Sequence, residues 1–446
     1  MALNKHRYSN LFFSVTYIGM YLMLFYGCWG NGKDKNGQNI SPIVVREGTA
    51  LDVSAIQTLQ AGIKAWYDTV LLSGGFNGGI LVAKNGHVIF ENYRGNAHID
   101  QHDTITATTP FHIASTTKTF TAMAILKLWQ EGKLKLTDEF AQYFPEFNYP
   151  GVTIKSLLNH RSGLPNYTYF MDVMNWDKSV YITNKDVLQF LITHKNEMVN
   201  VVPPETHFSY CNTNYALLAL LIEKLSGQSY PNYLKTNFFE PLHMTHSFVF
   251  SMADSNKVSP SYDWKGRIFP LNFLDVVYGD KNIYSTPQDL LKWERGLSAS
   301  NLFADSTLQA AYAPYSNEKK GTRNYGLGWR LTLPEGANKI IYHNGWWHGN
   351  NAAFIRLLND SVTIIVLGNK FNRKIYHAKA MAALFGNYGI SNVDEEGGLL
   401  NDSAKDKVNE TDKKEVTPPI KSAQKKLEIK VEKSASKNKP LAKKKH

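Results

Sequence analysis

Two short apolar runs near the start of the folded region are separated by the dipeptide Asn85-Gly86, in the stretch GGILVAKNGHVIF at 78–90. An Asn-Gly pair between two such runs is typical of the two-residue turn of a β-hairpin. The pattern therefore predicts an antiparallel hairpin, with strands at 80–84 and 87–90.

A helical spacing of apolar positions follows. Phe120, Ala124 and Leu128 recur every four residues, and Gly132 comes just after them. This spacing with a glycine stop predicts an amphipathic helix over 117–131. A second helix is predicted over 214–225, before Gly227. The whole region from 136 to about 274 has the pattern of helices and loops.

Strand patterns return after Tyr325. We predict strands at 325–331, 339–343, 352–358 and 362–367, the last two joined at Asn359-Asp360. The chain thus leaves a sheet, builds a helical lobe and returns to strands. We expect an α/β (α+β) architecture, which the 446 residues allow as one large two-lobed domain or two domains with tails.

The N-terminal segment has the form of an export signal. Basic residues at 5 and 7 precede an apolar stretch over 11–25, which is shorter than the ~20 residues of a membrane span. Cys28 after Gly27 resembles a bacterial lipoprotein cleavage site. We predict a signal or membrane-anchor segment over 1–28, lipidated at Cys28, with an uncleaved anchor and ordinary cleavage as alternatives. Residues 29–50 are predicted to be a flexible linker, and the protein is expected in the cell envelope, outside the cytoplasm and anchored to the membrane.

The positive charge is concentrated at the other end. Residues 401–446 hold 14 lysines against 7 acidic residues, which is +7 of the net charge of +11. The rest of the chain has no basic stripe interleaved with aromatics, so nucleic acid is not an expected partner. We predict a folded domain over 51–392 and a disordered Lys-rich tail over 393–446, either simply solvated or attracted to an anionic envelope surface.

Metal and cofactor signals are missing from the sequence. The two cysteines, Cys28 and Cys211, lie in such different contexts that no disulfide is expected between them. The 14 histidines form no H-E-x-x-H motif or comparable ligand cluster. We expect neither a metal nor a cofactor.

The first candidate for chemistry is Ser115-Thr116-Thr117-Lys118. A Ser-x-x-Lys tetrad at the start of a helix places the amine one turn from the hydroxyl on the same face, and the helix N-terminus favours an oxyanion beside it. The tetrad alone is weak evidence, because four others occur. They begin at Ser316, Ser422, Ser434 and Ser436, all in polar or disordered sequence.

Two further motifs carry polar side chains of the kinds that acyl transfer uses. Tyr210-Cys211-Asn212 stands just before a predicted helix, and His343-Asn344-Gly345-Trp346 ends a predicted strand. The phenol would act as a base only beside a cation such as Lys118. An edge strand at Gly345 would offer a free N–H to an oxyanion hole. Taken singly, each motif also fits a structural role, as a packed tyrosine with a helix cap and as a hydrogen-bonded histidine.

Together, the order and spacing of the three motifs resemble those of the serine β-lactamase and penicillin-binding-protein-like hydrolases, specifically the class C-like group with its esterase and D-peptidase relatives. The resemblance covers roughly residues 52–390. Supporting stretches are the one at 78–90, LLNHRSGLPNY at 157–167, IYSTPQDLLKW at 283–293 and YGLGWRL at 325–331. The resemblance implies an antiparallel sheet flanked by helices, an all-α lobe and an active site between them.

Carried over, the resemblance implies that Ser115 is the nucleophile, that Lys118 shares its proton and that Tyr210 is general base and then general acid. Asn212 would orient the substrate and Lys118. The backbone N–H groups of Ser115 and Trp346 would form the oxyanion hole. His343 would line the site and help to position the substrate or Tyr210, and Trp346 with Trp347 would wall the cleft. His160 and Arg161 are interpreted as structural.

The implied activity is a serine hydrolase acting on small esters, or on amides such as D-amino-acid peptides. The β-lactamases of this family usually carry a lysine where this chain has His343. A neutral imidazole is a poorer partner than an ammonium group for a substrate carboxylate. A penicillin-binding D-alanyl-D-alanine carboxypeptidase or weak β-lactamase is the alternative enzyme. An envelope binding or adaptor protein is the non-enzymatic alternative.

Overall fold

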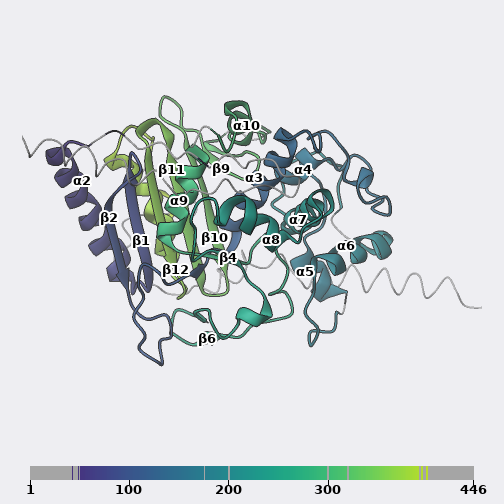
Figure 1. The fold of residues 1–446 in the computed structure, drawn as a ribbon, viewed down its shortest axis with the longest axis horizontal. Coiled ribbons are helices and arrows are strands. Elements are labelled where there is room, and N and C mark those ends of the chain that lie inside the picture. Colours follow the sequence, from purple (N-terminus) through teal and green to yellow (C-terminus); the bar gives the residue numbers. More distant parts are fainter. Residues whose placement is uncertain are drawn as a thin grey trace, which may run out of the picture. The chain divides into compact units, whose positions relative to one another are not determined.

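The computed structural model describes residues 51–390 except 175, 199–200, 299–300 and 319–320, together with Ile43, Thr49, 393–394 and 398–399. A seven-stranded antiparallel sheet is its largest element, in the order β2-β1-β12-β11-β10-β9-β8 (Figure 1). The strands are β1 Gly78–Lys84, β2 His87–Arg94, β8 Arg323–Tyr325, β9 Arg330–Thr332, β10 Ile340–Trp347, β11 Asn350–Leu357 and β12 Val362–Gly368.

The predicted hairpin at 78–90 is confirmed. β1 pairs antiparallel with β2, and the turn residues Asn85 and Gly86 both have positive φ, 50° and 76°. Asparagine and glycine tolerate this left-handed backbone better than other residues, and it matches the twist of the flanking strands. On its other side β1 pairs with β12, so the first and last strands of the domain lie together in the middle of one sheet.

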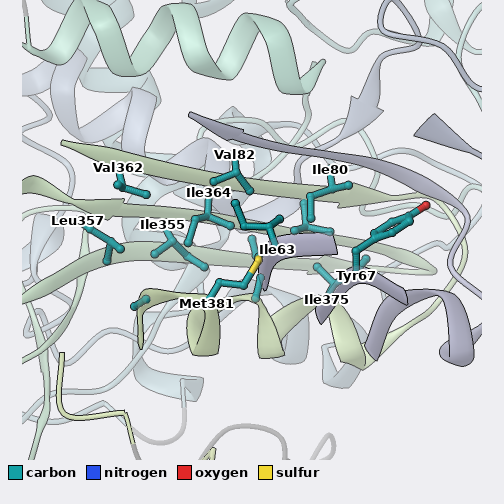
Figure 2. Close-up of a cluster of buried hydrophobic side chains, with 14 of the residues drawn as sticks. Ile63, Tyr67, Ile80, Val82, Ile355, Leu357, Val362, Ile364, Ile375 and Met381 are labelled. Carbon is teal, nitrogen blue, oxygen red and sulfur yellow. The ribbon is translucent and has the colours of Figure 1, made fainter. Parts of the chain in front are cut away.

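One face of the sheet packs on helices from both ends of the domain. These are α2 Val53–Trp66, η1 Tyr67–Leu71 and η9 Arg373–Leu384. Figure 2 shows Ile63, Tyr67 and Met381 of these helices against alternate side chains of β1, β11 and β12. Every second strand residue faces this core, and the buried apolar area is the main source of its stability.

The opposite face of the sheet carries α9 Pro287–Ser298, which packs on β1 and β12. The turn η3 Ala114–Thr116 packs against β10 and β11, and α3 Thr117–Gln130 continues from it into the helical lobe. α3 therefore connects the sheet to that lobe.

The helical lobe is built around α7 Asn212–Ser226, which contacts α3, α4, α5, α6 and α8 (Figure 1). α7 ends as predicted at Gly227, whose φ of 67° closes the helix in the left-handed conformation. The other helices of the domain are α4 Ile154–Leu158, α5 Tyr167–Val173, α6 Asn184–Thr193, α8 Tyr230–Leu234 and α10 Asp305–Ala311.

Short strands form three smaller sheets among the described residues. β3 Phe111–His112, β7 Ile283–Ser285 and β4 Phe248–Val249 form a three-stranded sheet in the order β3-β7-β4. β5 Ser261–Tyr262 pairs with β6 Ile268–Phe269, and β13 Val393–Asp394 pairs with β14 Gly398–Leu399. β3 ends three residues before Ser115, so this small sheet fixes the approach to the nucleophile.

Two predictions about these elements are wrong. The stretch 325–331 is not one strand: Gly326 to Trp329 form a turn between β8 and β9, and Gly328 has φ +87°, because the two glycines permit a reversal that apolar spacing hides. The helix at 117–131 is not amphipathic, since α3 is buried from Thr117 to Leu126. α7 and α10 pack against it, and its Phe120 stacks on Trp293 of α9, so most of the helix has no face toward solvent.

The predicted anchor over 1–28, with Cys28, and most of the Lys-rich tail lie outside the described residues. Within the described part of the chain, no helix combines the length and the apolar character needed to cross a membrane. The anchor, its lipidation and the tail's partner remain predictions.

Candidate active site

Ser115 lies on a strained turn at the base of α3. Ala114, the residue before it, has φ +47°, a left-handed conformation that costs about 1–3 kcal/mol for a residue with a side chain. The turn is held from below, because the N–H of Ala114 donates to Nδ1 of the buried His112 at 3.1 Å. Such strain persists only where the surroundings enforce it, and here it presents the Ser115 hydroxyl at the helix start.

Lys118 is the centre of the polar network. Its side chain is fully buried, and its Nζ donates to Ser115 Oγ at 3.1 Å, to Asn212 Oδ1 at 2.8 Å and to the backbone oxygen of Asp280 at 2.8 Å. Three oxygens match the three hydrogens of an ammonium group. The lysine is therefore held beside the serine by fixed acceptors from three separate segments.

Tyr210 and Asn212 reach the same network from the start of α7. The Tyr210 ring centroid lies 4.9 Å from Lys118 Nζ, within the range of a cation–π contact. Its buried hydroxyl has no hydrogen-bond partner among the described residues. The Tyr210 ring thus lies beside Lys118, the cation that a tyrosine would need to act as a base.

His343 is buried rather than open to the cleft. Its Nδ1 donates to the backbone oxygen of Asn344 at 2.7 Å, and its Nε2 accepts from the hydroxyl of Tyr325 at 3.1 Å. Burial, with help from the Arg330 and Lys118 charges, holds its pKa well below the usual value. The ring is therefore neutral, and it lies 6.4 Å, centroid to centroid, from the Tyr210 ring.

Gly345 lets β10 approach the nucleophile. A Cβ at this position would lie 2.2 Å from the backbone oxygen of Ile113 and 3.2 Å from the Ala114 side chain, so only glycine fits. β10 is not an edge strand of the sheet, but β9 pairs with it only at Ile340–Tyr342. β10 packs against η3, and the hydroxyl of Thr116 in η3 donates to the backbone oxygen of His343 at 3.4 Å. The Trp346 side chain is 44% exposed.

The structure brings Lys118 into contact with Ser115, Asn212 and the Tyr210 ring, with the His343 ring near Tyr210 and Gly345 against the turn before Ser115. Their catalytic and substrate-binding roles remain predictions.

Sequence reasoning missed two groups of this site. One is Arg330, whose guanidinium lies 5.2 Å from the Tyr210 ring centroid. Arg330 belongs to the stretch YGLGWRL at 325–331, which carries part of the family resemblance. That stretch was the sequence signal that could have pointed to Arg330. The other is the backbone carbonyl of Asp280, which accepts from Lys118. A backbone acceptor has no sequence signal, because every residue type supplies one.

A cavity of about 160 Å³ adjoins this network beyond Trp347 and His112. Apolar side chains form most of its wall, including Phe250, Val258 and Leu271. Its polar side is Asp275, which accepts from Trp347 Nε1 at 2.5 Å and lies 3.1 Å from His348 Nε2. Within the described residues, no group of three or more histidine, cysteine, aspartate or glutamate side chains is arranged to hold a metal.

The buried histidines make stability depend on pH. Burial lowers the pKa of His112 to about 4, against an unfolded value near ~6.5. Below pH ~6.5 the unfolded chain takes up a proton that the folded chain does not, so the free energy of unfolding decreases as the pH is lowered. At pH 5 this residue alone lowers it by about 2 kcal/mol. Urea unfolding of the wild type should show a lower free energy at pH 5 than at 7.5. His112→Gln should have a shallower pH slope, and an unchanged slope would remove His112 from the explanation.

The geometry has a counterpart in known proteins. Residues 56–386 match the protein family described as Beta-lactamase. The chain belongs to the beta-lactamase family. It is thus a serine hydrolase of this family, related to penicillin-binding proteins, and its fold is the β-lactamase/transpeptidase-like one of an antiparallel sheet with many helices.

Individual proteins are similar over much of this chain. Penicillin-binding protein 4* of Bacillus subtilis (strain 168) is 29% identical over 331 residues, 70% of this chain and 72% of that protein. Protein flp of Staphylococcus aureus (strain N315) is 32% identical over 321 residues, 65% of this chain but only 59% of the relative. The structure of the D-amino acid amidase of Ochrobactrum anthropi SV3 has a TM-score of 0.60 at 21% identity and covers 74% of this chain and 97% of that one.

Proposed function

We propose that this protein hydrolyses small esters or amides, including short peptides, through an acyl-enzyme on Ser115. The observation that carries the proposal is the contact of Lys118 Nζ with Ser115 Oγ at 3.1 Å, with the Tyr210 ring centroid 4.9 Å from the same nitrogen. A buried amine and a phenol next to one hydroxyl are the parts that an activated serine needs.

In the acylation step the Ser115 Oγ bonds to the substrate carbonyl carbon, and its proton passes to the Lys118–Tyr210 pair. The carbonyl oxygen becomes an oxyanion, which the N–H groups of Ser115 and Trp346 stabilise. The oxyanion then re-forms the carbonyl and the carbon–oxygen or carbon–nitrogen bond breaks. The leaving alcohol or amine takes the proton back from Tyr210 as general acid.

In the second step a water molecule gives its proton to the same pair and its oxygen attacks the acyl carbon. Collapse of the second oxyanion breaks the bond to Ser115 Oγ, which recovers the proton. The products are a carboxylic acid and the alcohol or amine, and no redox partner is needed. Asn212 holds Lys118 in place throughout, because its Oδ1 accepts from Nζ at 2.8 Å.

The substrate class follows from the charges around the site. The position that carries a lysine in most β-lactamases holds His343, whose ring is buried and neutral. Without an ammonium there, a substrate carboxylate gains little from that position. Esters and amides without a free carboxylate next to the reacting bond are therefore the leading substrates, consistent with a D-amino acid amidase among the related folds.

A second candidate is a D-alanyl-D-alanine carboxypeptidase or weak β-lactamase. Arg330 supplies a cation 5.2 Å from the Tyr210 ring centroid, which would serve a substrate carboxylate. The similarity to a penicillin-binding protein over 70% of the chain supports the same candidate. No contact in the described residues favours a purely binding role.

Covalent labelling separates these candidates. The full-length chain is treated with a fluorophosphonate and, separately, with benzylpenicillin, and adducts are located by intact mass and peptide mapping. We expect the fluorophosphonate to label Ser115 and penicillin to leave it unmodified. Labelling by both would favour the cell-wall candidate, and no adduct with either would contradict the hydrolase.

A further inference from the structure

His160 contacts Tyr210 and both of its neighbours in the chain. The His160 ring lies 4.3 Å from the Tyr210 ring, centroid to centroid. Its Nδ1 accepts from the N–H of Cys211 at 3.1 Å, and its backbone oxygen accepts from the N–H of Ser209 at 2.9 Å. The residues before and after the tyrosine are therefore both tied to one histidine, which also packs on the ring between them.

His160 is built to stay neutral and fixed. Its side chain is fully buried, and because Nδ1 accepts an N–H, the proton of the neutral ring is on Nε2. Burial and the nearby Lys118, His343 and Arg330 groups hold its pKa well below the usual value. Its φ of +59° is left-handed, so the backbone here is strained and enforced by the surrounding structure.

We infer that His160 is a positioning residue, which clamps Tyr210 in register with Lys118 and Ser115. The inference rests on the proposed function, in which Tyr210 transfers protons. Tyr210 belongs to no regular element of its own: it precedes α7, which begins at Asn212. Without the clamp the backbone on both sides of the ring would lose its hydrogen bonds to His160, and a shift of about 1 Å in a reacting group can cost about 10²-fold in rate.

The test separates the two parts of the clamp. His160→Asn keeps a hydrogen-bond acceptor close to the position of Nδ1 and tolerates a left-handed backbone, whereas His160→Phe keeps the ring and loses the acceptor. We expect kcat for a p-nitrophenyl ester to fall about 10²-fold in His160→Phe and less than about 10-fold in His160→Asn. The matched control is His243→Phe, because His243 has nearly the same backbone, φ +55°, and is exposed.

A second readout does not depend on turnover. Hydrogen exchange of the Cys211 amide, followed on overlapping peptides that span it, should accelerate in His160→Phe and stay slow in His160→Asn and His243→Phe. A folded His160→Phe with a rate within threefold of wild type, or a loss equal to that of His243→Phe, would overturn the inference. Should the wild type neither turn over ester nor take up fluorophosphonate, the proposed function fails, and unchanged exchange in His160→Phe would independently reject the clamp.

Discussion

Ser115→Ala should abolish ester turnover, with kcat/KM at least about a thousandfold below wild type, and should remove the fluorophosphonate adduct. The substitution deletes the hydroxyl at the start of the helix, which accepts a hydrogen bond from Lys118 Nζ at 3.1 Å. Without this oxygen there is no nucleophile to bond to the substrate carbonyl carbon, so no acyl-enzyme can form. Stopped assays on the purified variant and intact-mass labelling measure both effects.

Another Ser-x-x-Lys tetrad provides the control. Ser316 begins the same sequence pattern, yet it stands in a loop between α10 and β8, away from any helix start. Ser316→Ala should keep turnover within about twofold of wild type. Equal activity in Ser115→Ala and wild type would show that another group is the nucleophile.

Lys118→Met should lower kcat/KM by about 10²–10⁴-fold, the usual contribution of a positioned acid or base. Methionine fills a similar volume but removes the amine that lies beside Ser115 and the Tyr210 ring, and it leaves the Asn212 and Asp280 oxygens without their donor. Each unsatisfied buried acceptor costs about 1–3 kcal/mol. The thermal midpoint is therefore expected to fall as well, so rates are compared at a temperature where circular dichroism shows the variant folded.

A lysine on the same helix is the matched control. Lys127 lies on α3 and pairs with Glu131 at 2.8 Å on a partly exposed surface. Lys127→Met should leave kcat/KM within about twofold, because surface ion pairs contribute little. If Lys118→Met kept more than a tenth of the wild-type rate, proton transfer would have to be assigned to Tyr210 alone.

Local chemistry in the sequence was enough for several features. Asn85-Gly86 determined the first hairpin, because few dipeptides accept two residues of positive φ. Gly132 and Gly227 marked the ends of α3 and α7, because each glycine has the positive φ that commonly follows the end of a helix. The Ser115–Lys118 contact follows from three-residue spacing on a helix, and the three motifs in order were enough to indicate the family.

Tertiary structure decided what spacing cannot express. The burial of α3 from Thr117 to Leu126 depends on which elements surround it, and the turn inside 325–331 depends on a conformation of Gly328 that the apolar pattern does not encode. The burial and neutral state of His343 depend on Tyr325 and Arg330. His160 is near Tyr210 only because a loop much earlier in the chain folds against the start of α7. The preference for a turn or a helix depends on residues that are close in the sequence. The packing and the electrostatic environment of a side chain depend on residues that only the fold brings together.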